Sequence, residues 1–196
     1  MKVIDFEPYR RGEKTLQELA EGLGRDDLAR LTNEICDLEL ELIRDAEDPD
    51  FSFVPDDPEA DDRFAATPDE EHIAWTLGHV IVHATASSEE AAAHALTLAR
   101  GLEVQGRSRY EVPWREATTA RMLRERIEES RRMRLSMLEA WPDPPHVDVF
   151  YQANATRAPV NAVGRFLGGL NHDDEHVPQM NKVLTQARAA RARVNA

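Results

Sequence analysis

Residues 67–100, TPDEEHIAWTLGHVIVHATASSEEAAAHALTLAR, decide the fold, because they predict one long amphipathic helix in the middle of the chain. Thr67, Pro68 and Glu70 suit a helix start, with a side-chain cap, a proline at the first helical position and a capping box. Gly101 suits the positive φ that commonly ends a helix. At about 100° per residue, four histidines share one stripe beside an apolar face. They are His72, His79, His83 and His94.

Three other long helices are expected around this one. Leucine and isoleucine recur at steps of three and four from Asp26 to about Asp45, after a short helix near residues 16–23. Pro113 and Pro159 suit the first position of two further helices. The later of these contains a glycine pair, residues 168–169, which we expect to bend it. Without an alternating strand pattern, the chain predicts an all-α four-helix bundle with a short extra N-terminal helix.

The chain is expected to form one domain, residues 1–196, with the core bundle over about residues 25–185. Residues 47–62 hold three prolines and eight acidic side chains, which predicts a solvated loop. The basic, alanine-rich residues 186–196 are expected to fray.

Charge and composition argue against several classes of partner. With Asp+Glu 37 against Lys+Arg 24, the formal net charge of −13 disfavours binding to nucleic acid or to an anionic membrane surface. No apolar run approaches the roughly 20 residues that cross a bilayer. The N-terminus lacks the apolar segment of a secretory signal, and Cys36 is the single cysteine, so a cytoplasmic location is expected. We expect Cys36 to be a buried, inert thiol.

Two histidine pairs with i, i+4 spacing are candidates for a metal site: His79 with His83, and His172 with His176. Each pair projects from one side of a helix, and neutral imidazole suits zinc, nickel, copper and iron(II). Three histidines and one water would make an open, catalytic type of zinc site. On an unbroken helix His172 lies nearly opposite the apolar side. Such a site therefore needs the glycine pair to reset the helix phase, or His172 at a solvent-filled mouth; exposed histidines without a metal are the alternative.

The same two stretches resemble a known family. Residues 75–83, WTLGHVIVH, resemble the helix-two motif of DinB/YfiT-like proteins, in which a Trp-Ser/Thr start precedes the metal histidine by eight residues. Residues 172–179, HDDEHVPQ, resemble the last-helix box of that DinB superfamily, a His-x-x-x-His often followed by glutamine. The resemblance implies a four-helix bundle in which His83, His172 and His176 hold a divalent transition metal, with zinc or nickel favoured. Characterised branches include S-transferases and isomerases that depend on mycothiol or bacillithiol.

His79, one turn before His83, is a departure from the family pattern. It is a candidate for a fourth ligand, a hydrogen-bond partner of a ligand or a proton carrier, or else a solvent-facing histidine. His72 and His94 are expected at the surface or an interface, and His146 in a loop. Arg134 falls on the inward face of its helix. It could neutralise a carboxylate or extend its charged end to the edge of the bundle.

Three functions follow from these residues. In an enzyme, a thiol cofactor at the open position would lose its proton and attack an electrophilic substrate. Glu90 and Glu175 are candidate bases or hydrogen-bond partners, and both also suit an ordinary acidic surface. The alternatives are a metal-containing bundle that binds a small ligand without turnover, and a stress-response homodimer with a structural metal. A small-molecule substrate or thiol is the expected partner.

Overall fold

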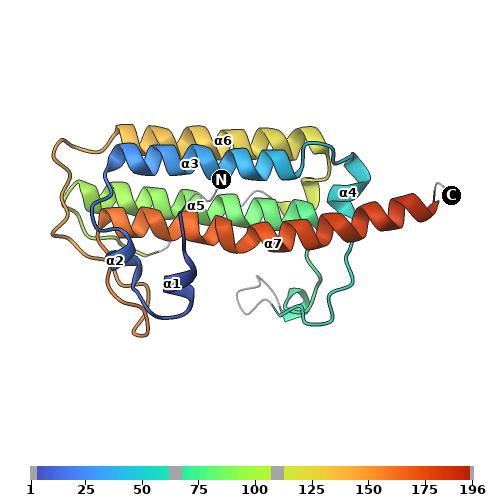
Figure 1. Cartoon of the computed structure of the whole chain (residues 1–196), viewed down its shortest axis with the longest axis horizontal. Helices are drawn as coiled ribbons and strands as arrows, with labels where there is room; N and C mark the ends of the chain where they lie inside the picture. Colours follow the sequence, from blue (N-terminus) through green and yellow to red (C-terminus); the bar gives the residue numbers. More distant parts are fainter. Residues whose placement is uncertain (1–3, 62–67, 107–112, 195–196) are drawn as a thin grey trace.

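The computed structural model describes residues 4–61, 68–106 and 113–194, and the regular structure of these residues is helical. Four long helices lie side by side (Figure 1). They are α3 (Arg25–Leu42), α5 (Leu77–Ala99), α6 (Ala120–Glu139) and α7 (Ala162–Val194). The short elements are α1 (Glu7–Arg10), α2 (Leu16–Leu19), α4 (Asp48–Ser52) and the 3₁₀ turns η1 (Pro68–Glu70) and η2 (Trp114–Glu116). Extended pairing in the described ranges is limited to an isolated bridge between Tyr151 and Val160. The all-helical prediction is confirmed for these residues.

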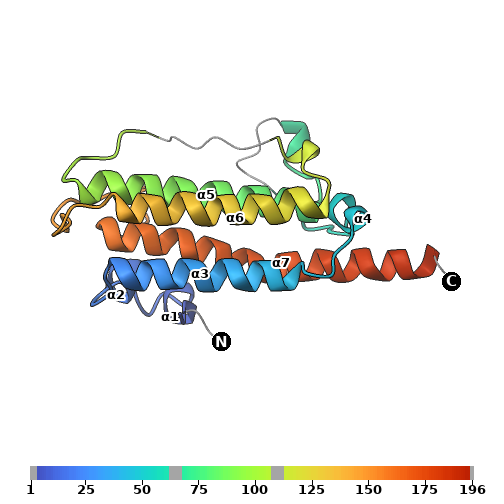
Figure 2. The ribbon, with the colours of Figure 1, turned by 90° about the horizontal axis from the view of Figure 1, so that it is seen from above.

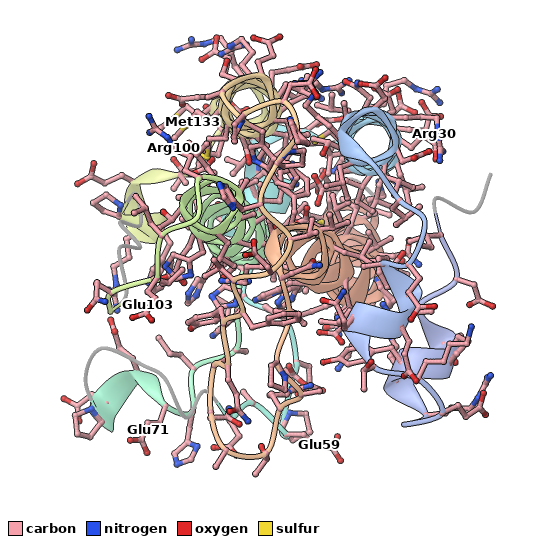
Figure 3. All side chains as sticks on the ribbon, turned by 90° about the vertical axis from the view of Figure 1, so that its left-hand side faces the viewer. Arg30, Glu59, Glu71, Arg100, Glu103 and Met133 are labelled. Atoms are coloured by element: carbon pink, nitrogen blue, oxygen red, sulfur yellow. The ribbon has the colours of Figure 1, made fainter. Side chains whose placement is uncertain are left out.

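The long helices follow one another around the core in the order α3, α6, α5, α7, and α7 closes the ring against α3. Helices α3 and α7 run in one direction and α5 and α6 in the other, while the last turns of α7 extend beyond the rest (Figures 1 and 2). The α1–α2 segment and the connections before α5 and before α7 all lie on one side of the α5–α7 pair (Figure 3). A cavity lined by residues of α5, α7 and these connections lies on this side.

Helices α5 and α7 approach each other closely because small residues line their contact. A Cβ atom added at Gly169 would lie only 2.7 Å from the Cβ of Ala91 and 3.2 Å from the Cα of Ser88. A Cβ atom at Gly168 would meet nothing nearer than 3.4 Å, at Leu16. Helix α7 continues through both glycines, so no break resets its phase. Gly169 therefore serves the close packing of α7 against α5.

None of the three helices expected to begin at Pro68, Pro113 or Pro159 begins there; α6 begins at Ala120 and α7 at Ala162. Helix α5 begins at Leu77, because the side chain of Thr76 accepts the backbone N–H of His79 at 3.2 Å and caps it there. Pro68 begins only a 3₁₀ turn, and the expected cap Thr67 lies outside the described residues. Thr119 caps α6 in the same way. Proline is tolerated at a helix start, whereas a side-chain cap satisfies a free N–H group, and here the caps fix the boundary. The expected positive φ at Gly101 is confirmed, at 77°.

Two other segments are more ordered than expected. The acidic stretch after Glu47 contains α4, whose start is closed by Asp50 accepting the backbone N–H of Glu47 at 2.9 Å. The chain remains helical to Val194, since alanine and arginine are strong helix formers and Arg191 pairs with both Glu47 and Asp50. None of the described helices combines the length and the apolar character that crossing a membrane requires.

Candidate metal centre

His83 of α5 and His172 and His176 of α7 converge at one point. One ring nitrogen from each lies within 4.8 Å of the others. The ring centroids are 5.0 Å apart between His83 and each partner and 4.6 Å apart between the two partners. The predicted grouping of these three residues is confirmed. Each side chain is half-buried, which leaves the group at the border between core and solvent.

The register between α5 and α7 places these side chains opposite one another. Below the histidines, the hydroxyl of Ser88 hydrogen-bonds Oδ1 of Asp173 at 2.5 Å and lies 2.9 Å from the carbonyl oxygen of Gly169. Ser88 and Asp173 are both buried. The Ser88–Asp173 hydrogen bond and the close approach of Gly169 to Ser88 together fix the register of α5 against α7. This contact therefore sets the separation of His83 from the α7 pair.

The protonation state of His176 suits the binding of a cation. Nδ1 of His176 lies 2.7 Å from Oε1 of Gln179, an acceptor, so this nitrogen carries the proton and Nε2 keeps its lone pair. Burial, reinforced by the neighbouring His172, lowers the pKa of His176 and favours its neutral form. Nδ1 of His172 is buried without a hydrogen-bond partner among the described residues. Zinc and nickel accept imidazole nitrogens as ligands, so three histidine rings gathered at one point fit the metal.

His79 is not a member of this group. Its ring is stacked between two tryptophans, with centroids 4.3 Å from Trp75 and 4.2 Å from Trp114, and with only 1° between its plane and that of Trp114. Desolvation lowers the pKa of His79 to about 4, so the ring is neutral at physiological pH. Trp75 also contacts His83, at 4.6 Å between centroids. His79 therefore supports the tryptophan that forms one wall of the centre.

The three histidines open onto a cavity of about 800 Å³ between the α5–α7 pair and the connections that cover it. Glu90 and Glu175, the two candidate bases, both line this cavity. Glu90 is half-buried, whereas Glu175 is exposed and accepts a hydrogen bond from Nδ2 of Asn171 at 2.9 Å. A second cavity of about 580 Å³ adjoins the first and shares several wall residues, including His172. Of the two arrangements that the sequence allowed, the structure has the one in which His172 borders a solvent-accessible cavity.

The remaining histidines have other surroundings. His94 was expected at the surface or an interface and is instead only 5 % exposed within the chain, because Tyr151 and Arg165 cover it. The expectation failed because a connection far along the chain folds over this face of α5. His72 is exposed, as expected. His146 lies in the loop before α7, where its ring packs against Gly101 and its Nδ1 is 3.3 Å from Asp148.

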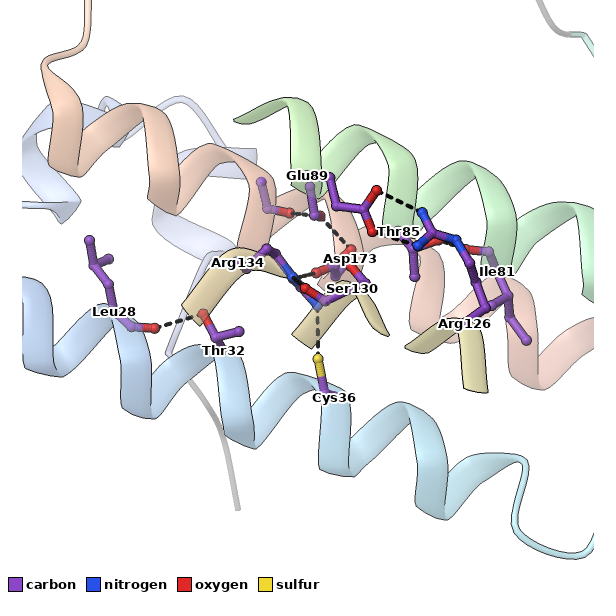
Figure 4. Close-up of polar contacts among 12 residues, drawn as sticks. Leu28, Thr32, Cys36, Ile81, Thr85, Glu89, Arg126, Ser130, Arg134 and Asp173 are labelled. Atoms are coloured by element: carbon purple, nitrogen blue, oxygen red, sulfur yellow. Dashed lines mark hydrogen bonds and ion pairs between the residues drawn. The ribbon is translucent and has the colours of Figure 1, made fainter. Parts of the chain in front are cut away.

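A buried polar cluster in the core joins Cys36 of α3, Arg134 of α6 and Asp173 of α7 (Figure 4). Arg134 is only 1 % exposed, and its guanidinium lies 2.5 Å from Oδ2 of Asp173 and 2.8 Å from Sγ of Cys36. The alternative in which Arg134 extends to the bundle edge is wrong, because Asp173 balances its charge inside. Burial raises the pKa of Cys36 to about 12, so it is an unreactive buried thiol, as expected.

Asp173 is the residue that sequence reasoning missed. It follows Leu170 by three positions and Phe166 by seven, so helical periodicity places it on the buried face of the last helix. A carboxylate on that face, with an inward arginine on another helix, was an available signal for a buried ion pair.

Comparison of the chain with protein-family models, with curated proteins and with solved structures gave no match.

Proposed function

We propose that this protein is a DinB-like four-helix bundle that catalyses thiol-dependent S-transfer with a divalent transition metal held by His83, His172 and His176. The observation that carries the proposal is the meeting of three ring nitrogens, within 4.8 Å of one another, on the wall of a cavity of about 800 Å³. A cavity of this size accommodates a small molecule beside the histidines. A bound metal ion would lower the pKa of a coordinated thiol and so favour the nucleophilic thiolate.

Three ligands support a catalytic centre over a structural one. A structural zinc site is closed by four protein ligands, whereas catalytic sites use three and keep one position for water or substrate. Among the described residues, the group that could hold a metal contains three histidines and neither a cysteine nor a carboxylate. The half-exposed rings at the cavity wall agree with an exchangeable fourth position.

The surrounding side chains supply orientation and proton transfer in this proposal. Gln179 holds the His176 ring by its Nδ1–H and directs Nε2 toward the centre. Trp75 packs against His83 and restricts water on that side. A carboxylate oxygen of Glu90, two helical turns after His83 and on the same cavity, receives the thiol proton. The thiolate sulfur then attacks an electrophilic carbon, a C–S bond forms, and the leaving group departs with its electron pair.

The test uses purified protein loaded with zinc or nickel and monochlorobimane as the electrophile. Cysteine, mycothiol and bacillithiol are supplied in turn, and formation of the fluorescent thioether is followed. We expect at least one thiol to react faster with the loaded wild type than with His83→Ala. His72→Ala is the matched control, because His72 is exposed and outside the group. Equal rates with and without protein for all three thiols would contradict catalysis and favour the metal-containing, ligand-binding bundle.

A further inference from the structure

Two arginines lie on the wall that the two adjoining cavities share. Arg157, from the connection before α7, and Arg165, from the first turn of α7, line both the cavity of about 800 Å³ and the one of about 580 Å³. His172 lines both cavities as well. The two arginines thus border the space beside the histidines, in a protein whose net charge is −13. Two positively charged side chains on one cavity wall of an acidic protein suggest that the cavity binds an anionic group.

Each arginine is held by a tyrosine. The guanidinium carbon of Arg157 lies 5.9 Å from the ring centroid of Tyr9, and its Nη1 donates to the Tyr9 hydroxyl. The corresponding carbon of Arg165 lies 5.5 Å from the ring centroid of Tyr151. Arg165 also directs Nε and Nη2 at Nδ1 of His94, at 3.4 and 3.3 Å. Stacking on an aromatic ring orients a guanidinium without consuming its charge.

Three of the acidic side chains on the same walls are engaged by other groups. Glu13 pairs with Arg11 at 2.7 Å, and Glu18 accepts the backbone N–H of Thr15 at 2.6 Å in a helix cap. Asp57 pairs with Lys182 at 3.0 Å. Arg157, in contrast, forms no ion pair within the part of the chain that the structure describes, and its hydroxyl partner is uncharged. Its positive charge is therefore not neutralised by the acidic residues around it.

We propose that Arg157 and Arg165 bind a carboxylate group of the thiol or of its electrophilic partner, so that the ligand is oriented with its reactive end toward the histidines. The planar donors of guanidinium match the two oxygens of a carboxylate. The acidic residues elsewhere on the cavity wall disfavour a more highly charged anion such as phosphate. This inference rests on the proposed function, because it assigns the substrate class of the same cavity.

The test compares ω-mercaptoalkanoates of increasing chain length with their neutral amides, using zinc-loaded protein and isothermal titration calorimetry. Each carboxylate and its amide differ only at the end that the arginines would contact. We expect one range of chain lengths in which the carboxylate binds about tenfold more tightly, which corresponds to about one charge-assisted hydrogen-bonded contact. Arg157→Gln and Arg165→Gln should each reduce that ratio toward one and leave the amide affinity unchanged.

The control variant is Arg121→Gln, because Arg121 is an exposed residue of α6 that pairs with Glu125 and lines neither cavity. It should keep the wild-type ratio. Affinity for the amide in each variant reports on folding, so a loss of both affinities is not mistaken for loss of the carboxylate contact. Chelation of zinc by the carboxylate itself would produce a preference that persists in both arginine variants, and this result would overturn the proposal.

The two proposals fail in different ways. If no member of either series binds the zinc-loaded protein, the thiol-dependent function is wrong and the carboxylate site falls with it. If the amides bind as tightly as the carboxylates at every chain length, the carboxylate site is wrong while thiol binding at the centre stands.

Discussion

His172 and Asp173 are adjacent on α7, yet they belong to two regions with opposite properties. Asp173 faces the core, is 0 % exposed, and has partners for both oxygens in Ser88 and Arg134. His172 lines the cavity and has a buried Nδ1 without a hydrogen-bond partner among the described residues. Asp173 is therefore satisfied by two partners inside the protein, whereas His172 keeps one ring nitrogen without a hydrogen bond to the described residues. An unpartnered nitrogen on a cavity wall favours a ligand site over a structural polar cluster.

Of the variants considered, Arg134→Met should reduce the stability of the protein most. It leaves Asp173 buried without its counter-charge, and removing one partner of a buried ion pair costs about 3–5 kcal/mol. The free energy of unfolding, measured by urea denaturation, should fall by this amount. Arg121→Met on the same helix removes an exposed pair with Glu125 and should cost less than about 1 kcal/mol. Equal losses in the two variants would show that the buried pair has no special role.

Substitutions at the two glycines of α7 test whether the close contact between α5 and α7 positions the histidines. Gly169→Ala places a methyl group 2.7 Å from Ala91, so it should reduce the free energy of unfolding by about 1–3 kcal/mol and weaken metal binding. Gly168→Ala meets only ordinary contacts and gains helix propensity, so it should be neutral or stabilising by up to about 1 kcal/mol. Thermal or urea denaturation with zinc titration measures both. Similar behaviour of the two variants would argue against the close helix contact as the determinant of the site.

Glu39 gives the core region a pH dependence. It is fully buried, neither of its oxygens has a partner among the described residues, and desolvation together with Asp173 raises its pKa from 4.5 to about 8. The folded state therefore binds this proton more tightly than the unfolded chain does. Its contribution to stability is complete below about pH 4.5 and is lost as the pH rises through about 8.

Glu39→Gln should remove this contribution while keeping the shape of the side chain. Between pH 5 and 8, the stability of the wild type should fall relative to the variant by up to about 1.4 kcal/mol per pH unit. Urea denaturation at several pH values, with the metal-free protein, supplies the comparison. Parallel stability profiles for the two proteins would mean that Glu39 is ionised in the fold.

His79→Phe should have the smallest effect. The phenyl ring preserves the stack between Trp75 and Trp114, and the neutral imidazole that it replaces is outside the histidine group. The free energy of unfolding should change by less than about 1 kcal/mol, and the metal content should be unchanged. Loss of metal from this variant would assign a ligand role to His79.

The sequence predicted the histidine group because helical spacing carries its information locally. His172 and His176 share a helix face by their spacing, and the Trp75–His83 stretch identified the third member. Residue Asp173 was within reach of the same reasoning, because its position relative to Phe166 and Leu170 marks the buried face. The grouping itself depended on α5 meeting α7, a contact that helical spacing does not specify and that the family resemblance implied.

Other features depend on contacts between distant segments, and periodicity cannot supply these. His79 is covered by Trp114 from the connection before α6, and His94 by Tyr151 from the connection before α7. The helix starts were misplaced because several residues near each boundary can cap a helix, and tertiary packing selects among them. Arg157 lies in a connection outside the histidine motifs and carries no local signal, whereas Arg165 precedes His172 by seven residues and shares its helix face.

Metal analysis of the purified protein tests the central claim most directly. Wild type, His83→Ala, His172→Ala and the control His72→Ala are purified without chelators or metal columns, supplied with zinc, desalted and analysed for metal content and far-UV circular dichroism. The account predicts close to one zinc or nickel ion per chain in the wild type and the control, and loss of the metal with retained helicity in the two site variants. Wild-type protein that takes up no metal, or site variants that keep it, would contradict the claim that these histidines form a metal centre.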